Sequence, residues 1–162
     1  MFDTIFGLPL HPLLVHATEV VVPTAALVVL VAALWPRFRA WARLLPLALA
    51  LVALSLVPLS TESGEQLEAR VGRSELVTAH ADMAEGLLPW VAGLVVVAGA
   101  LLWWNAPKRA SARARRWVAV VLVVAAALAS AGTTVQAIRI GHSGATAVWS
   151  DVVSSPALPD DR

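Results

Sequence analysis

The sequence predicts an all-α integral membrane protein that folds as a bundle of four membrane-spanning helices. Hydrophobic residues make up 59% of the 162 residues and charged residues only 14%, whereas soluble domains contain about 45–50% and about 25%, respectively. The mean hydropathy is +0.76, and the apolar residues are concentrated in long runs. This composition leaves too few charges to cover a water-facing surface, which argues against a soluble enzyme and against a disordered chain.

Four apolar runs supply the predicted spans, at about residues 12–35, 40–59, 80–104 and 117–138. Each run is long enough to cross about 30 Å of hydrocarbon at about 1.5 Å per residue. Apolar residues surround each helix on all sides, so none has the narrow stripe of a surface helix. We expect one domain over residues 1–155, with short connections between antiparallel neighbours, and a disordered tail over residues 156–162.

Proline and tryptophan mark the ends of these spans. Trp35-Pro36 and Asn105-Ala106-Pro107 are stop signals after the first and third runs, because proline cannot continue a helix. The third run proper begins near Gly86, and we expect a helical extension back to Glu75. Several tryptophans fall where the spans should meet the lipid headgroups: Trp35, Trp41, Trp103, Trp104 and Trp117.

The connections between the runs predict the orientation in the membrane. The connections after the first and third runs carry eight basic residues: Arg37, Arg39, Arg43, Lys108, Arg109, Arg113, Arg115 and Arg116. The opposite side carries four: Arg70, Arg73, Arg139 and Arg162. By the positive-inside rule the two basic connections are cytoplasmic, so both termini and the loop at residues 60–75 face outward.

All four histidines are expected at this outer end of the bundle. His11 and His16 lie at the start of the first run, His80 precedes the third, and His142 follows the fourth. Ionisable groups in a membrane are costly and mark functional sites by default. Imidazole binds zinc, copper and iron, and two opposed imidazoles can ligate haem iron. The histidines therefore predict a site for haem b or for a transition-metal ion (iron, copper or zinc).

His16 and His80 are the preferred ligands, because they lie on facing helix ends; the other two histidines come next. His16 and Glu19 are three residues apart and share a helix face, and Glu85 is expected to meet them from the third span. Both carboxylates would orient an imidazole or complete a metal shell. His11 lies five residues before His16, about 140° around a helix, so the two can share a small ligand only if the helix breaks.

The remaining motifs are less specific. Gly141-His142-Ser143-Gly144-Ala145 suits a tight turn or a helix C-cap, and residues 61–68 suit a helix cap or a lid. The chain has no cysteine, which excludes disulfides and thiolate metal sites, and it has no phosphate loop, catalytic triad or nucleic-acid motif. The two halves also share a weak repeat, which pairs His16, Glu19 and Pro23 with His80, Glu85 and Pro89.

Three segments form a pattern that covers almost the whole chain: Gly7-Leu8-Pro9-Leu10-His11-Pro12 with His16, then His80, then Gly141-His142-Ser143-Gly144-Ala145 with Trp149. In these segments the sequence resembles a bacterial membrane family described as domain of unknown function 2231. The resemblance implies four spans and a place in the bacterial cytoplasmic membrane. Similar domains occur fused to Rieske-type iron–sulfur domains, which implies a role near electron transfer.

The sequence thus predicts a multi-pass membrane protein with a histidine site at its outer face and a role linked to electron transfer. The expected partners are the lipid bilayer and a separate redox protein such as a Rieske-type protein, with no nucleic acid. We expect no independent catalytic activity. Two alternatives stay open: a helper subunit whose histidines only form hydrogen bonds, and an ion or proton conductor through His16 and Glu19. Apolar cytoplasmic halves in the first and fourth spans argue against conduction.

Overall fold

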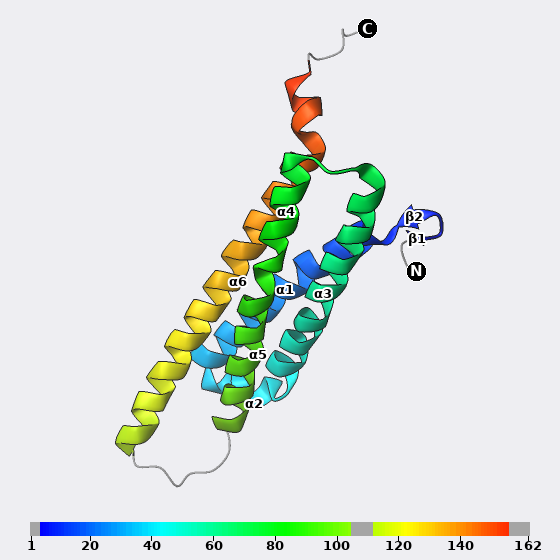
Figure 1. The fold of residues 1–162 in the computed structure, drawn as a ribbon. Helices are drawn as coiled ribbons and strands as arrows, with labels where there is room; N and C mark the ends of the chain where they lie inside the picture. Colours follow the sequence, from blue (N-terminus) through cyan, green and yellow to red (C-terminus); the bar gives the residue numbers. More distant parts are fainter. Residues whose placement is uncertain (1–3, 105–111, 156–162) are drawn as a thin grey trace, which may run out of the picture.

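The computed structural model describes residues 4–104 and 112–155, and these residues are almost entirely helical (Figure 1). Within them the helices are α1 (Leu10–Leu34), α2 (Pro36–Ala42), α3 (Leu45–Val71), α4 (Glu75–Glu85), α5 (Leu87–Trp104) and α6 (Ala112–Ser154). A short antiparallel hairpin of β1 (Thr4–Ile5) and β2 (Leu8–Pro9) precedes α1. Four helical stretches are long and apolar enough to cross a membrane: Leu10–Leu34, Leu45–Val71, Glu75–Trp104 and Arg116–Ser154. The predicted all-α, four-helix membrane bundle is confirmed.

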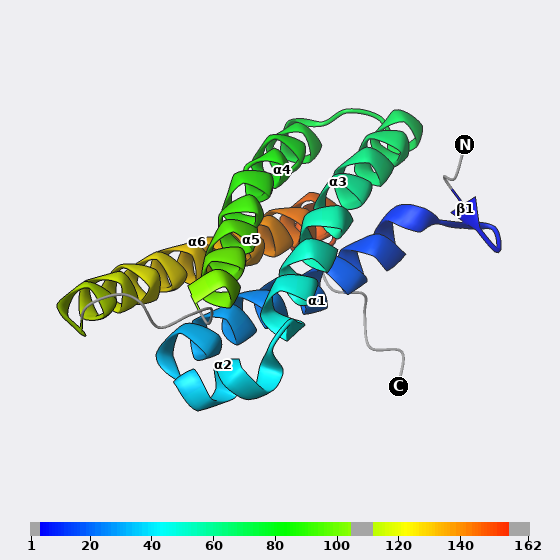
Figure 2. The same cartoon turned by 90° about the horizontal axis from the view of Figure 1, so that it is seen from below.

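The four long helices form a square in cross-section. α1 packs on α3 and α6, and α5 packs on the same two helices, so α1 and α5 lie on the diagonal. Figure 2 shows α3 between α1 and the α4–α5 pair. We name the two ends of the bundle by their residues. The start of α1, the end of α3, α4 and the end of α6 form the histidine end, and α2, the end of α5 and the start of α6 form the basic end.

Small side chains bring the helices close together in the core. Close approach matters here because lipid supplies no hydrophobic force between helices, so packing and polar contacts must hold the bundle. One such contact joins α6 to α1, where Ser130 Oγ donates 2.8 Å to the Ala26 carbonyl. Alanines are buried on α1, α3 and α6, among them Ala25, Ala26, Ala32, Ala50, Ala53 and Ala126.

The helices extend beyond the expected spans at the histidine end. α3 runs to Val71, so residues 61–68 lie inside a helix and form neither a cap nor a lid. Glutamate, glutamine and leucine in this segment are strong helix formers, and the helix ends only before Gly72, which has φ +87°. α6 likewise continues through Gly141–Ala145, which is neither a turn nor a C-cap.

Prolines set the other helix boundaries. α1 ends at Leu34 because Trp35, which precedes a proline, adopts extended angles (φ −121°, ψ 93°). The third span is interrupted at Gly86, between α4 and α5, because Pro89 has no N–H for the carbonyl four residues earlier. Three features expected from the sequence lie outside the described residues: the tail at 156–162, the stop at 105–107, and the basic residues Lys108 and Arg109.

Candidate functional site at the histidine end

Two of the four histidines turn into the bundle and two turn away from it. His11 on α1 and His80 on α4 are half-buried, whereas His16 and His142 are exposed. The separation of His11 and His16 explains this difference, because five residues place their side chains about 140° apart around an unbroken helix. When His11 faces α3, His16 must face outward.

His11 is held by the last turns of α3. Its Nδ1 lies 3.1 Å from the Ser60 carbonyl and 3.1 Å from Ser63 Oγ. The ring also lies directly on Gly64, where a Cβ would stand only 3.1 Å from His11 Cε1. Ser63 and Gly64 together therefore form a seat that positions this imidazole.

His80 is held in the same manner by α6. Its Nδ1 lies 2.9 Å from Ser143 Oγ, and that hydroxyl also bonds to the Ile140 carbonyl at 2.9 Å. The ring lies on Gly144, where a Cβ would stand 3.0 Å from His80 Cε1. Each imidazole thus lies on a Ser-Gly pair, and the serine of each pair bonds to the backbone carbonyl three residues before it.

The serine hydroxyls fix the tautomer of both rings. Ser63 Oγ donates to the Ser60 carbonyl at 2.9 Å, and Ser143 Oγ donates to the Ile140 carbonyl at 2.9 Å. A hydroxyl has one proton, so each serine accepts a hydrogen bond from the histidine that it contacts. This pattern favours the tautomer with the proton on Nδ1 in both imidazoles, which would leave the lone pair on each Nε2 as an acceptor or a metal ligand.

The two imidazoles come from diagonal elements, α1 and α4, at the same end of the bundle. Gln66 lies one helical turn beyond Ser63 on α3, and its Oε1 is buried without a hydrogen-bond donor among the described residues. The end of α3 thus holds one buried side-chain acceptor close in sequence to Ser63, which contacts His11.

The other predicted ligands do not join this pair. His16 Nδ1 bonds to the Pro12 carbonyl of its own helix. Glu19 is exposed, and its carboxylate lies against α6, where Oε1 would stand 2.9 Å from a Cβ at Gly141. Glu85 is also exposed, at the end of α4. No group of three histidine, cysteine, aspartate or glutamate residues close enough to hold a metal ion occurs in the described parts of the chain.

His16, one of the two preferred ligands, is exposed, whereas His11 and His80 are half-buried. His11 and His16 face different sides because α1 does not break between them. His142 faces outward although its neighbours Ser143 and Gly144 contact His80. Whether any of these residues binds a cofactor stays a prediction.

The sequence contains a signal for these contacts beyond the histidines themselves. Each inward-facing histidine contacts a Ser-Gly dipeptide much later in the chain. Ser63 lies 52 residues after His11, and Ser143 lies 63 residues after His80. The α1–α3 half and the α4–α6 half therefore repeat one contact. The repeat pairs His11 with His80, not His16 with His80 as the sequence suggested.

The fold and its four apolar helices define a multi-pass integral membrane protein. A family model described as "Predicted membrane protein (DUF2231)" matches residues 7–156. The chain belongs to this family, which confirms the resemblance seen in the histidine motifs. No curated protein and no solved structure matches the chain.

Proposed function

We propose that this membrane protein binds a transition-metal ion between His11 and His80 at the histidine end, in a role linked to electron transfer. The matched hydrogen bonds of the two rings carry this proposal. Metal-ligating histidines characteristically donate from one ring nitrogen to a carbonyl or another acceptor, which orients the other nitrogen toward the metal. Both His11 and His80 are prepared in this way by Ser63 and Ser143.

The donor set favours a metal that accepts imidazole, namely copper, zinc or iron. Two imidazoles are fewer ligands than a closed structural site uses, so the remaining positions would go to water, to an external ligand or to the Gln66 oxygen. A copper or iron ion would supply one-electron chemistry, and His11 and His80 would hold it. The electron donor or acceptor would be a separate protein, for which a Rieske-type protein is the candidate that the family resemblance suggests.

Haem b fits the donors but would have to displace existing contacts. Two opposed imidazoles are a common pair of axial ligands. Each ring, however, already packs on its glycine, His11 on Gly64 and His80 on Gly144. Haem would enter only if the helices moved apart, so we favour a metal ion.

A second candidate is a helper subunit without a cofactor. Each imidazole ties two helices together, α1 to α3 and α4 to α6, and such ties alone would stabilise the bundle. Ion or proton conduction has less support, because the buried residues toward the basic end are alanine, valine and leucine, among them Ala32, Ala33, Val97 and Leu101.

Metal analysis of the detergent-purified protein, prepared without a histidine tag, tests the proposal. We expect one copper, zinc or iron ion per chain, and we expect His11→Gln and His80→Gln to abolish its retention. His16→Gln and His142→Gln are matched controls with exposed imidazoles and should retain the metal. An absorption spectrum with a Soret band would favour haem instead. Metal-free wild-type protein that cannot be loaded would contradict the proposal and favour the helper subunit.

A further inference from the structure

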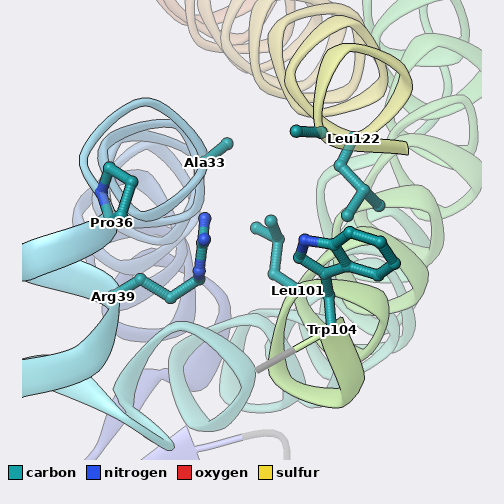
Figure 3. Close-up of a pocket in the computed structure, with 7 residues that line it drawn as sticks. Ala33, Pro36, Arg39, Leu101, Trp104 and Leu122 are labelled. Carbon is teal, nitrogen blue, oxygen red and sulfur yellow. The ribbon is translucent and has the colours of Figure 1, made fainter. Parts of the chain in front are cut away.

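A second site lies at the basic end, remote from the histidines. A cavity of about 70 Å³ opens there between α1, α2, α5 and α6 (Figure 3). This volume is well above the ~10–15 Å³ that one water molecule needs. Its walls are mainly apolar, with Pro36 and Leu101 among them, and one cationic side chain, Arg39, extends into it.

Arg39 points into the bundle for a reason that the sequence makes plain. In an uninterrupted helix the Ala32 carbonyl would accept from the N–H of residue 36, but residue 36 is proline and has none. Arg39 Nη1 donates to that carbonyl instead, at 2.9 Å. The guanidinium is a planar fork of five N–H groups, and this bond anchors it beside the cavity. Arg37 on the same helix is exposed.

The cavity favours an anion. Burial lowers the pKa of the Arg39 guanidinium, yet arginine stays protonated in proteins, so a charge that has lost part of its water is held there. Trp104 lines the opposite wall, with its indole nitrogen turned toward the same space (Figure 3). An indole nitrogen is a donor only. Two nitrogen donors from α2 and α5 thus face a space with apolar walls.

The depth of the cavity indicates where the anion comes from. α2 carries the aromatic residues Phe38 and Trp41 and follows directly on Trp35. The ring centroids are 6.4 Å apart for Trp35 and Phe38 and 5.8 Å apart for Phe38 and Trp41. Both tryptophans are exposed, as is typical of anchors at the level of lipid headgroups. We therefore expect the cavity to lie at the depth of the lipid phosphates.

We propose that this cavity binds the phosphate of an anionic phospholipid, with Arg39 and Trp104 as the donors and the acyl chains along the apolar helix surface. Arginine forks bind phosphate oxygens with good geometry. Basic pockets between transmembrane helices are known lipid-headgroup sites. The site would fasten α2 to the end of α5, because its two donors come from these helices.

Native mass spectrometry of the detergent-purified protein with phosphatidylglycerol or phosphatidylcholine tests this inference. We expect the wild-type chain to retain one phosphatidylglycerol preferentially. Arg39→Gln should weaken retention about 10–100-fold, as loss of a charge-assisted hydrogen bond would. Arg37→Gln removes the same charge from an exposed position of α2 and should retain the lipid.

Trp104→Phe keeps the ring and leaves the Arg39–Ala32 bond in place, so it tests the site even if Arg39→Gln does not fold. It should weaken lipid retention severalfold. Equal losses in Arg37→Gln and Arg39→Gln would indicate diffuse attraction to surface charge and would overturn the site. Equal retention of phosphatidylcholine would also overturn it. If inorganic phosphate at millimolar concentration stabilises the protein without lipid, through Arg39, the cavity takes free phosphate and the lipid assignment is wrong.

Discussion

The indole ring of Trp90 on α5 lies so close to Gly132 on α6 that a Cβ at this glycine would stand 2.1 Å from Trp90 Cζ3. Real Cβ atoms are not found at such distances, so no side chain larger than hydrogen fits unless the ring moves. The two residues fix how near α5 and α6 approach in the middle of the bundle.

Gly132→Ala should therefore destabilise the protein by about 1–3 kcal/mol, the usual cost of overpacking. The measurement is reversible unfolding in mixed micelles, followed by tryptophan fluorescence. Gly99→Ala on α5 is the matched control, because a Cβ there meets nothing within 4 Å. Equal stabilities of the two variants would show that Trp90 can move away at little cost.

The break between α4 and α5 is supported from α6. Gln136 Nε2 donates 2.8 Å to the Met83 carbonyl, which lies in the turn that Gly86 and Pro89 interrupt. Gln136→Leu should cost about 0.6 kcal/mol and no more than about 1.7 kcal/mol, the average and the maximum for hydrogen bonds between membrane helices. Ser55→Ala removes a bond within one helix, from Ser55 to Leu51, and should cost less in the same unfolding assay. A larger loss in Ser55→Ala would argue against a supporting role for Gln136.

The serine seats should control metal affinity if the proposed function is right. Ser63→Ala and Ser143→Ala each remove the acceptor that fixes the tautomer of a histidine, His11 or His80. Each change should weaken binding of added copper or zinc by about 10–100-fold, as loss of an orienting partner does. Thr146→Ala, which removes a bond to the carbonyl of its own helix, should leave the affinity unchanged. Wild-type affinity in both serine variants would remove the seats from the site.

The orientation in the membrane is open to a labelling experiment, because the chain has no native cysteine. Ser74→Cys in the loop before α4 and Ala40→Cys on α2 introduce thiols at two exposed positions. By the positive-inside rule, an impermeant reagent should label Ser74→Cys in intact cells and Ala40→Cys only after permeabilisation. The reverse pattern would place the histidine end in the cytoplasm.

Helix number and the bundle class follow from the sequence, because the length of an apolar run decides whether it can cross a bilayer. The end of α1 before Trp35-Pro36 also follows from the sequence, since a proline constrains the residue before it. Four histidines at one end follow from counting spans. These features depend on the properties of single segments.

The pairing at the site depends on the tertiary structure. Each span is apolar on all sides, so the sequence does not specify how a helix is rotated about its axis, and this rotation decides that His11 faces inward and His16 outward. The contact of His11 with Ser63 joins residues 52 positions apart, and the contact of His80 with Ser143 joins residues 63 positions apart. The bond from Arg39 to Ala32 likewise depends on how α2 folds back on α1. The sequence by itself determined the spans and the residue types at each end of the bundle. Helix rotation and packing decided which of those residues meet. The sequence could not decide this, because the lipid-exposed and buried faces of these helices have nearly the same composition.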